Sequence, residues 1–141
     1  MTQEDKKLLL KDLCARLPYR VKIQDYQKLG EYALLKQVDF RRKQIAVETG
    51  IGSFEGVDFY KLEWSLPYLR PMSSMTEEEK DNLQSLHDII SDENYGDGYS
   101  PSAWNAITEW EDYCNARHLD YRGLIPMGLA LEAPEDMYKT E

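Results

Sequence analysis

The segment LPYLRPMSSMTEEEK, residues 66–80, separates two halves of the chain that differ in character. Pro67 and Pro71 lie four residues apart in it, and proline disfavours both a helix interior and ladder pairing. Thr76 and Glu79 have the spacing of a capping box, which is typical of a helix start. We therefore expect the fold to change here from strands to helices.

The residues before this segment predict one helix followed by antiparallel strands. Thr2 can cap a helix whose apolar residues recur every three or four positions and which ends before Pro18. From there to residue 59 the apolar period falls to two. The predicted strands are 21–26, 32–38, 44–48 and 57–62. Two glycines in 49–53 predict a turn between the last two. This half should form a small curved antiparallel sheet, or an SH3-like barrel, packed on the N-terminal helix.

The residues after the segment predict two helices and a folded-back tail. The first helix begins after Thr76 and should end in an Asp- and Gly-rich loop at 92–99, and the second spans about 101–117 because Ser100 and Pro101 form a start signal. The first helix is expected to bury Leu83, Leu86, Ile89 and Ile90. The second is expected to bury Ala103, Ile107, Trp110 and Cys114, with Trp104 and Tyr113 packed beside them. The tail, 119–134, should return to the core. The fold class is therefore α+β, with a C-terminal helical half.

The length and charge of the chain limit how many domains it can form and which partners it can bind. A chain of 141 residues fits one compact domain, 1–141, with 1–72 and 73–141 as candidate subdomains. Residues 1–72 carry 13 Lys and Arg against 10 Asp and Glu, whereas residues 73–141 carry 4 against 16. An acidic half repels nucleic acid and membranes and favours a basic partner, or it serves only as a solvated surface.

The sequence lacks the signatures of several classes of protein and of several kinds of site. No apolar run approaches the roughly 20 residues of a membrane span, and the acidic start is unlike a signal peptide, so we expect a cytoplasmic protein. Cys14 and Cys114 should be buried free thiols. Gly50 and Gly52 fit neither a phosphate-binding nor a dinucleotide-binding loop, so no cofactor is expected. No metal site is expected either, because Cys114 and a surface His118 cannot supply a full ligand set.

Two groups of residues are candidates for binding. Aromatic area combined with a planar cation is typical of binding hot spots, and four residues at the central segment and in the tail have this character. They are Tyr68, Arg70, Tyr121 and Arg122. The competing interpretation is that Arg70 and Arg122 pair with acids and hold the two halves together. A basic set in the strand region could bind nucleic acid, or could be ordinary solvated residues. It comprises Arg20, Lys22, Lys36, Arg41, Arg42 and Lys43.

Three segments resemble an uncharacterised family of small proteins from gut Bacteroides genomes and their phage-like and mobile elements. They are KKLLLKDLCARL with the following PY (6–19), PYLRPMSSMTEEE (67–79) and DYRGLIPMGLALEAPEDMY (120–138), about a third of the chain. The resemblance implies a bacterial cytoplasm and a possible phage origin. It implies no catalytic residue, because the family has no known activity.

The sequence therefore favours a non-enzymatic interaction or accessory protein whose acidic half faces a partner. The alternatives are nucleic-acid binding through the basic strands and an acidic half that mimics DNA and inhibits a DNA-binding protein. An enzyme with an unusual site would require a deep pocket with converging polar groups.

Overall fold

The structure, a computed structural model, describes residues 1–25, 32–48, 57–93 and 101–138. Helix α1 (Gln3–Arg16) begins with a reciprocal cap in which the Asp5 N–H donates to Thr2 Oγ1 (3.0 Å) and the Thr2 N–H to Asp5 Oδ2 (3.1 Å). A 3-10 turn at Leu17–Tyr19 ends the helix, because Pro18 cannot continue it. The predicted helix is confirmed.

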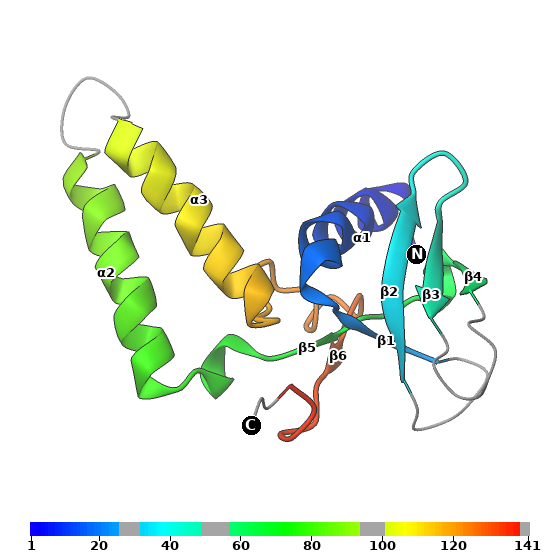
Figure 1. The fold of residues 1–141 in the computed structure, drawn as a ribbon. Coiled ribbons are helices and arrows are strands. Elements are labelled where there is room, and N and C mark those ends of the chain that lie inside the picture. The colour runs from blue at the N-terminus through cyan, green and yellow to red at the C-terminus, as the bar shows by residue number, and fades with distance from the viewer. Residues whose placement is uncertain (26–31, 49–56, 94–100, 139–141) are drawn as a thin grey trace.

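Four antiparallel strands form one sheet, in the order in which they occur in the chain. They are β1 (Lys22–Gln24), β2 (Tyr32–Asp39), β3 (Gln44–Glu48) and β4 (Val57–Lys61). The register places Leu35 opposite Val47 and Ile45 opposite Tyr60, so that one face is apolar. Helix α1 covers this face, and Leu9 and Leu13 are fully buried against it (Figure 1). The α+β prediction is confirmed.

The sheet curls into a half-barrel and does not close. Strands β1 and β4 are its two edges, so the described strands do not form the SH3-like barrel that was the alternative expectation. A bulge between Leu35 and Gln37 in β2 adds to the curl. The turn predicted at 49–53 lies outside the described residues, as does most of the loop predicted at 92–99.

The central segment pairs with the tail, which corrects the expectation that its prolines prevent ladder pairing. Strand β5 (Tyr68–Leu69) runs parallel to β6 (Leu131–Glu132). Proline lacks an N–H but keeps its carbonyl, and the carbonyl of Pro67 accepts from the N–H of Leu131 at 2.8 Å. The tail therefore packs back as predicted, and Leu124 and Leu129 join the core.

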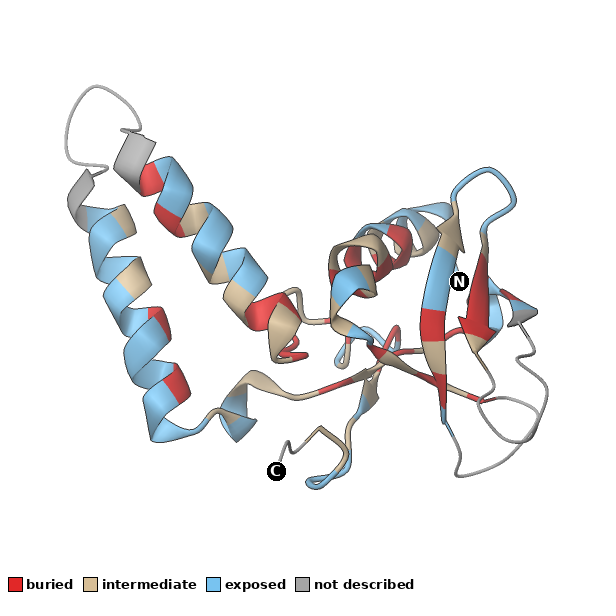
Figure 2. Ribbon diagram, viewed as in Figure 1, coloured by how far each residue is buried: buried red, intermediate tan, exposed pale blue. Residues whose placement is uncertain are grey.

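Helices α2 (Glu77–Glu93) and α3 (Pro101–Ala116) pack on each other and extend from the body as an arm (Figure 1). Two helices alone can bury only the seam between them, so much of the arm is exposed (Figure 2). Leu83 and Cys114 are buried at its base. Ile89 is 43% exposed and Trp104 is 55% exposed, so the expectation that both are buried was wrong.

Candidate functional site

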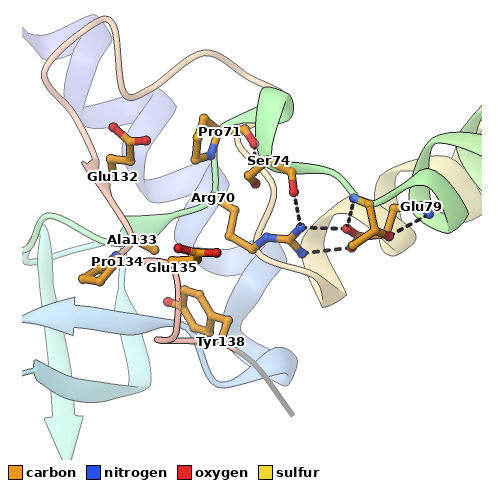
Figure 3. A pocket seen from close by; sticks show the side chains of 10 residues that line it. Arg70, Pro71, Ser74, Glu79, Glu132, Ala133, Pro134, Glu135 and Tyr138 are labelled. Atoms are coloured by element: carbon orange, nitrogen blue, oxygen red, sulfur yellow. Dashed lines mark hydrogen bonds and ion pairs between the residues drawn. The ribbon is translucent and has the colours of Figure 1, made fainter. Parts of the chain in front are cut away.

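The base of the arm is fixed by Arg70, one of the predicted binding residues. Its guanidinium forms a two-pronged ion pair with Glu79, with Nη1 to Oε2 at 2.9 Å and Nη2 to Oε1 at 2.7 Å (Figure 3). The same group donates to the backbone carbonyls of Ser74 (3.1 Å) and Arg117 (3.3 Å). One side chain thus joins the central segment to the first turn of α2 and the end of α3.

Glu79 is also part of the predicted capping box of α2. Its Oε1 accepts from the N–H of Thr76 (2.9 Å), while the Thr76 hydroxyl accepts from the N–H of Glu79 (3.1 Å). The hydrogen bonds from Arg70 outweigh the cost of burial and lower the pKa of Glu79 to about 2. The carboxylate is therefore ionised at neutral pH and is unsuited to general acid catalysis.

A cavity of about 570 Å³ opens beside this ion pair (Figure 3). It is lined by Arg70, Pro71, Ser74, Thr76, Glu79, Glu132, Ala133, Pro134, Glu135 and Tyr138. The hydroxyl of Ser74 donates to the carbonyl of Pro71 (2.7 Å), and that of Tyr138 donates to the carbonyl of Tyr68 (2.8 Å). These contacts build a structural junction and supply no activated nucleophile.

Arg122, a second predicted binding residue, belongs to a separate buried ion cluster. Asp12 Oδ1 accepts from Arg122 Nε (3.1 Å) and Asp12 Oδ2 from Arg16 Nε (2.8 Å). Both Asp12 and Arg16 are fully buried. Arg122 also donates to the hydroxyl of its neighbour Tyr121 (2.8 Å). The cluster joins α1 to the tail.

The geometry of Arg70 and Arg122 agrees with the competing interpretation, in which these two residues pair with acids. Arg70 and Arg122 pair with acids at two different junctions, and Tyr68 lies half-buried in β5 with its carbonyl bound to Tyr138. The sequence could suggest this pairing, but it could not identify the partners, because Asp12 lies 110 positions from Arg122.

The six basic residues of the nucleic-acid hypothesis occupy three places. Lys36 pairs with Glu48 at 3.1 Å in the sheet. Arg41, Arg42 and Lys43 lie exposed in the β2–β3 turn, where Lys43 Nζ donates to Gln3 Oε1. Arg20 lies just before β1, and Lys22 is the first residue of β1. The set is thus divided between the β1–β2 part of the sheet and the turn that joins β2 to β3.

The arm concentrates the acidic charge that the sequence places in the second half. Residues 77–116 contain 11 Asp and Glu and one Lys, whereas the other 101 residues contain 15 acidic and 16 basic residues. On α3, Glu109, Glu111 and Asp112 are exposed, and Trp104 is exposed on the same helix. The arm thus offers carboxylates together with apolar area.

His118 is a buried residue that the sequence interpretation placed at the surface. It is 9% exposed, has a left-handed backbone with φ of 60°, and stacks on Tyr138 with ring centroids 3.8 Å apart. Burial lowers its pKa to about 4, so its ring is neutral at pH 7. The left-handed conformation after α3, which turns the side chain inward, has no clear signal in the sequence.

The two cysteines are free, with Cys114 buried and Cys14 half-buried. Burial raises the pKa of Cys114 to about 11, which makes it a poor nucleophile. Within the described ranges, no three His, Cys, Asp or Glu side chains gather as metal ligands would.

No protein-family model, curated protein or solved structure matches this chain. Among the helices of the described residues, none has the length and apolar character needed to cross a membrane.

Proposed function

We propose that this chain is a non-enzymatic interaction protein whose α2–α3 arm binds a partner protein with a basic surface. The observation that carries the proposal is the projection, from a nearly neutral body, of an arm whose two helices contain 10 acidic residues and one basic residue (Figure 1). Such charge raises the rate of encounter with a basic partner and disfavours acidic ones.

The apolar contacts of the arm would supply affinity that charge alone does not. Trp104 is 55% exposed on α3 and Ile89 is 43% exposed on α2. Tryptophan is enriched among the residues that dominate binding energies, and carboxylates around it favour Lys and Arg on the partner. The ion pair of Arg70 with Glu79 supports the proposal, because it holds the base of the arm in one orientation.

The test is affinity capture of the tagged chain from lysate of its host cell, with and without nuclease treatment. The arm variant combines Trp104→Ala, Glu109→Gln and Asp112→Asn. The charge-matched control is Glu4→Gln with Glu132→Gln, which removes two exposed carboxylates from the body. We expect a basic protein to be retained by the wild type and by the control and to be lost with the arm variant, and its retention to weaken as salt increases.

Two results would contradict the proposal. One is a partner that all three chains retain equally, because the arm would then make no contribution. The other is a partner that disappears with nuclease treatment, which would shift support to nucleic-acid binding. If the captured protein itself binds DNA and loses DNA when this chain is added, the DNA-mimic form of the proposal is supported.

A further inference from the structure

A second cavity, of about 350 Å³, lies between the β1–β2 edge of the sheet and the tail. It is lined by Tyr19, Arg20, Lys22, Tyr32, Leu34, His118, Met137 and Tyr138. Three of these eight side chains are tyrosines and two, Arg20 and Lys22, are basic. Its volume falls within the roughly 300 to 1,000 Å³ of small-ligand sites.

The aromatic wall of this cavity is held in place by its neighbours. The ammonium of Lys22 lies 4.5 Å from the ring centroid of Tyr32 and 5.1 Å from that of Tyr138. The Tyr138 ring stacks in turn on His118, with an interplanar angle of 17°. Tyr32 is 46% exposed, so part of its ring remains available to a ligand.

The charge of this cavity is opposite to that of the whole chain. Among the residues that the structure describes, its charged lining side chains are Arg20 and Lys22, and none of these described lining residues is a carboxylate. The Arg20 side chain is exposed and forms no ion pair or hydrogen bond within the described residues. A chain with a net charge of −9 thus places two cations beside aromatic rings in one cavity.

A buried polar atom without a partner lies in the same wall. Among the described residues, His118 Nδ1 is buried and has no hydrogen bond. An unsatisfied buried polar atom costs free energy, so such atoms are rare unless a water or a ligand satisfies them. The cavity therefore combines aromatic area with positive charge, and one of its lining residues carries an unsatisfied buried nitrogen.

We propose that this cavity binds a nucleotide, either free or as one unit of a single strand. The base stacks on the exposed part of Tyr32, and the phosphate lies against Arg20 and Lys22. Stacking on aromatic rings tolerates any base, and cations beside the rings meet the phosphate. Inorganic phosphate would use the cations alone and a nucleoside the rings alone, so only a nucleotide uses both. This site is independent of the arm.

The experiment is isothermal titration of the full chain with AMP, UMP, adenosine, inorganic phosphate and an eight-nucleotide single strand. We expect AMP and UMP to bind at least about tenfold more tightly than adenosine or phosphate, because losing a charge-assisted hydrogen bond or a stacked base costs about that factor. If only the strand binds measurably, the site recognises a nucleotide within a chain. If neither binds, the proposal is wrong.

Variants locate the binding. Arg20→Gln and Tyr32→Leu should each weaken it about tenfold, whereas Arg41→Gln, which removes the same charge from the exposed β2–β3 turn, should leave it unchanged. Unfolding midpoints of the variants show whether each one is folded. Equal effects of Arg20→Gln and Arg41→Gln would overturn the proposal, because they would indicate diffuse charge attraction.

The salt dependence of strand binding separates this cavity from a broad basic surface. A site with two cations should give a slope of log K against log salt of about −1.4, whereas a surface using all six basic strand residues would give about −4. A slope near −4 would overturn the assignment to this cavity.

Discussion

Arg70 and Glu79 form a bidentate ion pair at the point where the helical arm meets the body. The two residues are only nine positions apart in the sequence. Arg70 also donates to the carbonyl of Arg117, directly after α3, and so connects the pair to the second helix of the arm. It therefore fixes both helices of the arm at once. A surface ion pair contributes little to stability, but this one is mostly shielded from water, since the Glu79 side chain is 10% exposed.

Replacing Arg70 with Ala should destabilise the protein by about 2 to 4 kcal/mol, because Glu79 would be left buried without its main partner. Arg70→Lys should recover only part of the loss, since an ammonium cannot form both hydrogen bonds. Urea denaturation measures the change. The control Lys80→Gln breaks the exposed pair with Glu77 and should cost less than about 0.5 kcal/mol. Equal effects of Arg70→Ala and Lys80→Gln would contradict the structural role of Arg70.

Stability should fall as the pH drops from 6.5 toward 4 because of His118. Its folded pKa is about 4 against an ordinary value of 6.5, owing first to burial and then to the nearby cations Arg16, Lys22 and Arg70. As the pH falls, the unfolded chain binds the proton on His118 before the folded chain does. The contribution of neutral His118 to the free energy of unfolding is therefore complete above pH 6.5 and is lost on acidification. The shift corresponds to roughly 2 to 4 kcal/mol.

The variant His118→Asn isolates this effect, because asparagine tolerates the left-handed backbone and does not titrate. Denaturation curves at pH 7 and pH 5 should differ less for this variant than for the wild type. An identical pH dependence of the two would show that His118 is protonated without penalty. Glu79 titrates in a lower window, from its ordinary value of 4.5 down to about 2, and should contribute to unfolding only there.

Removing Asp12 should be the most damaging single change among those considered. Arg16 and Asp12 are fully buried, and Asp12→Ala would leave the Arg16 charge without its carboxylate. The expected loss is about 3 to 5 kcal/mol. The neighbouring Lys11→Gln is exposed and should be neutral within about 0.5 kcal/mol. A tolerated Asp12→Ala would mean that Arg16 reaches water in the folded chain.

Tyr138→Phe removes one hydroxyl that makes two contacts. This oxygen accepts from the N–H of Lys22 (2.9 Å) and donates to the carbonyl of Tyr68 (2.8 Å). We expect a loss of about 1 to 2 kcal/mol, and hydrogen exchange at the Lys22 amide should accelerate more than at amides of α2. Uniform acceleration throughout the chain would instead indicate global destabilisation.

The sequence predicted those parts of the fold that local signals determine. The caps at Thr2 and Thr76, and the alternation in residues 32–38 and 44–48, each depend on neighbours within a few positions, and the structure confirms them. The site was less predictable, because its contacts join distant residues. The pairing of β5 with β6 spans more than 60 positions, and the burial of His118 depends on Tyr138.

The exposure of Trp104 was missed for a related reason. A helix with regularly spaced aromatic residues is usually buried, but burial requires a third element against which to pack. Helix α3 contacts α2 along one side and α1 only near the base of the arm, so its outer face has no such element within the described chain. Helical periodicity indicates which residues share a face and leaves open whether that face is covered.

The segment that follows α3, and that contributes lining residues to both cavities, has a consequence for synthesis of the protein. Leu124 and Leu129 belong to the same core as α1 and the sheet. The amide of Lys22 donates to the hydroxyl of Tyr138, which lies 116 positions later in the chain. Contacts of such separation form late, because a long loop must close first. A nascent chain on the ribosome therefore cannot complete the core around α1 and the sheet until Leu124 and Leu129 have emerged, and products truncated before them remain open to proteases.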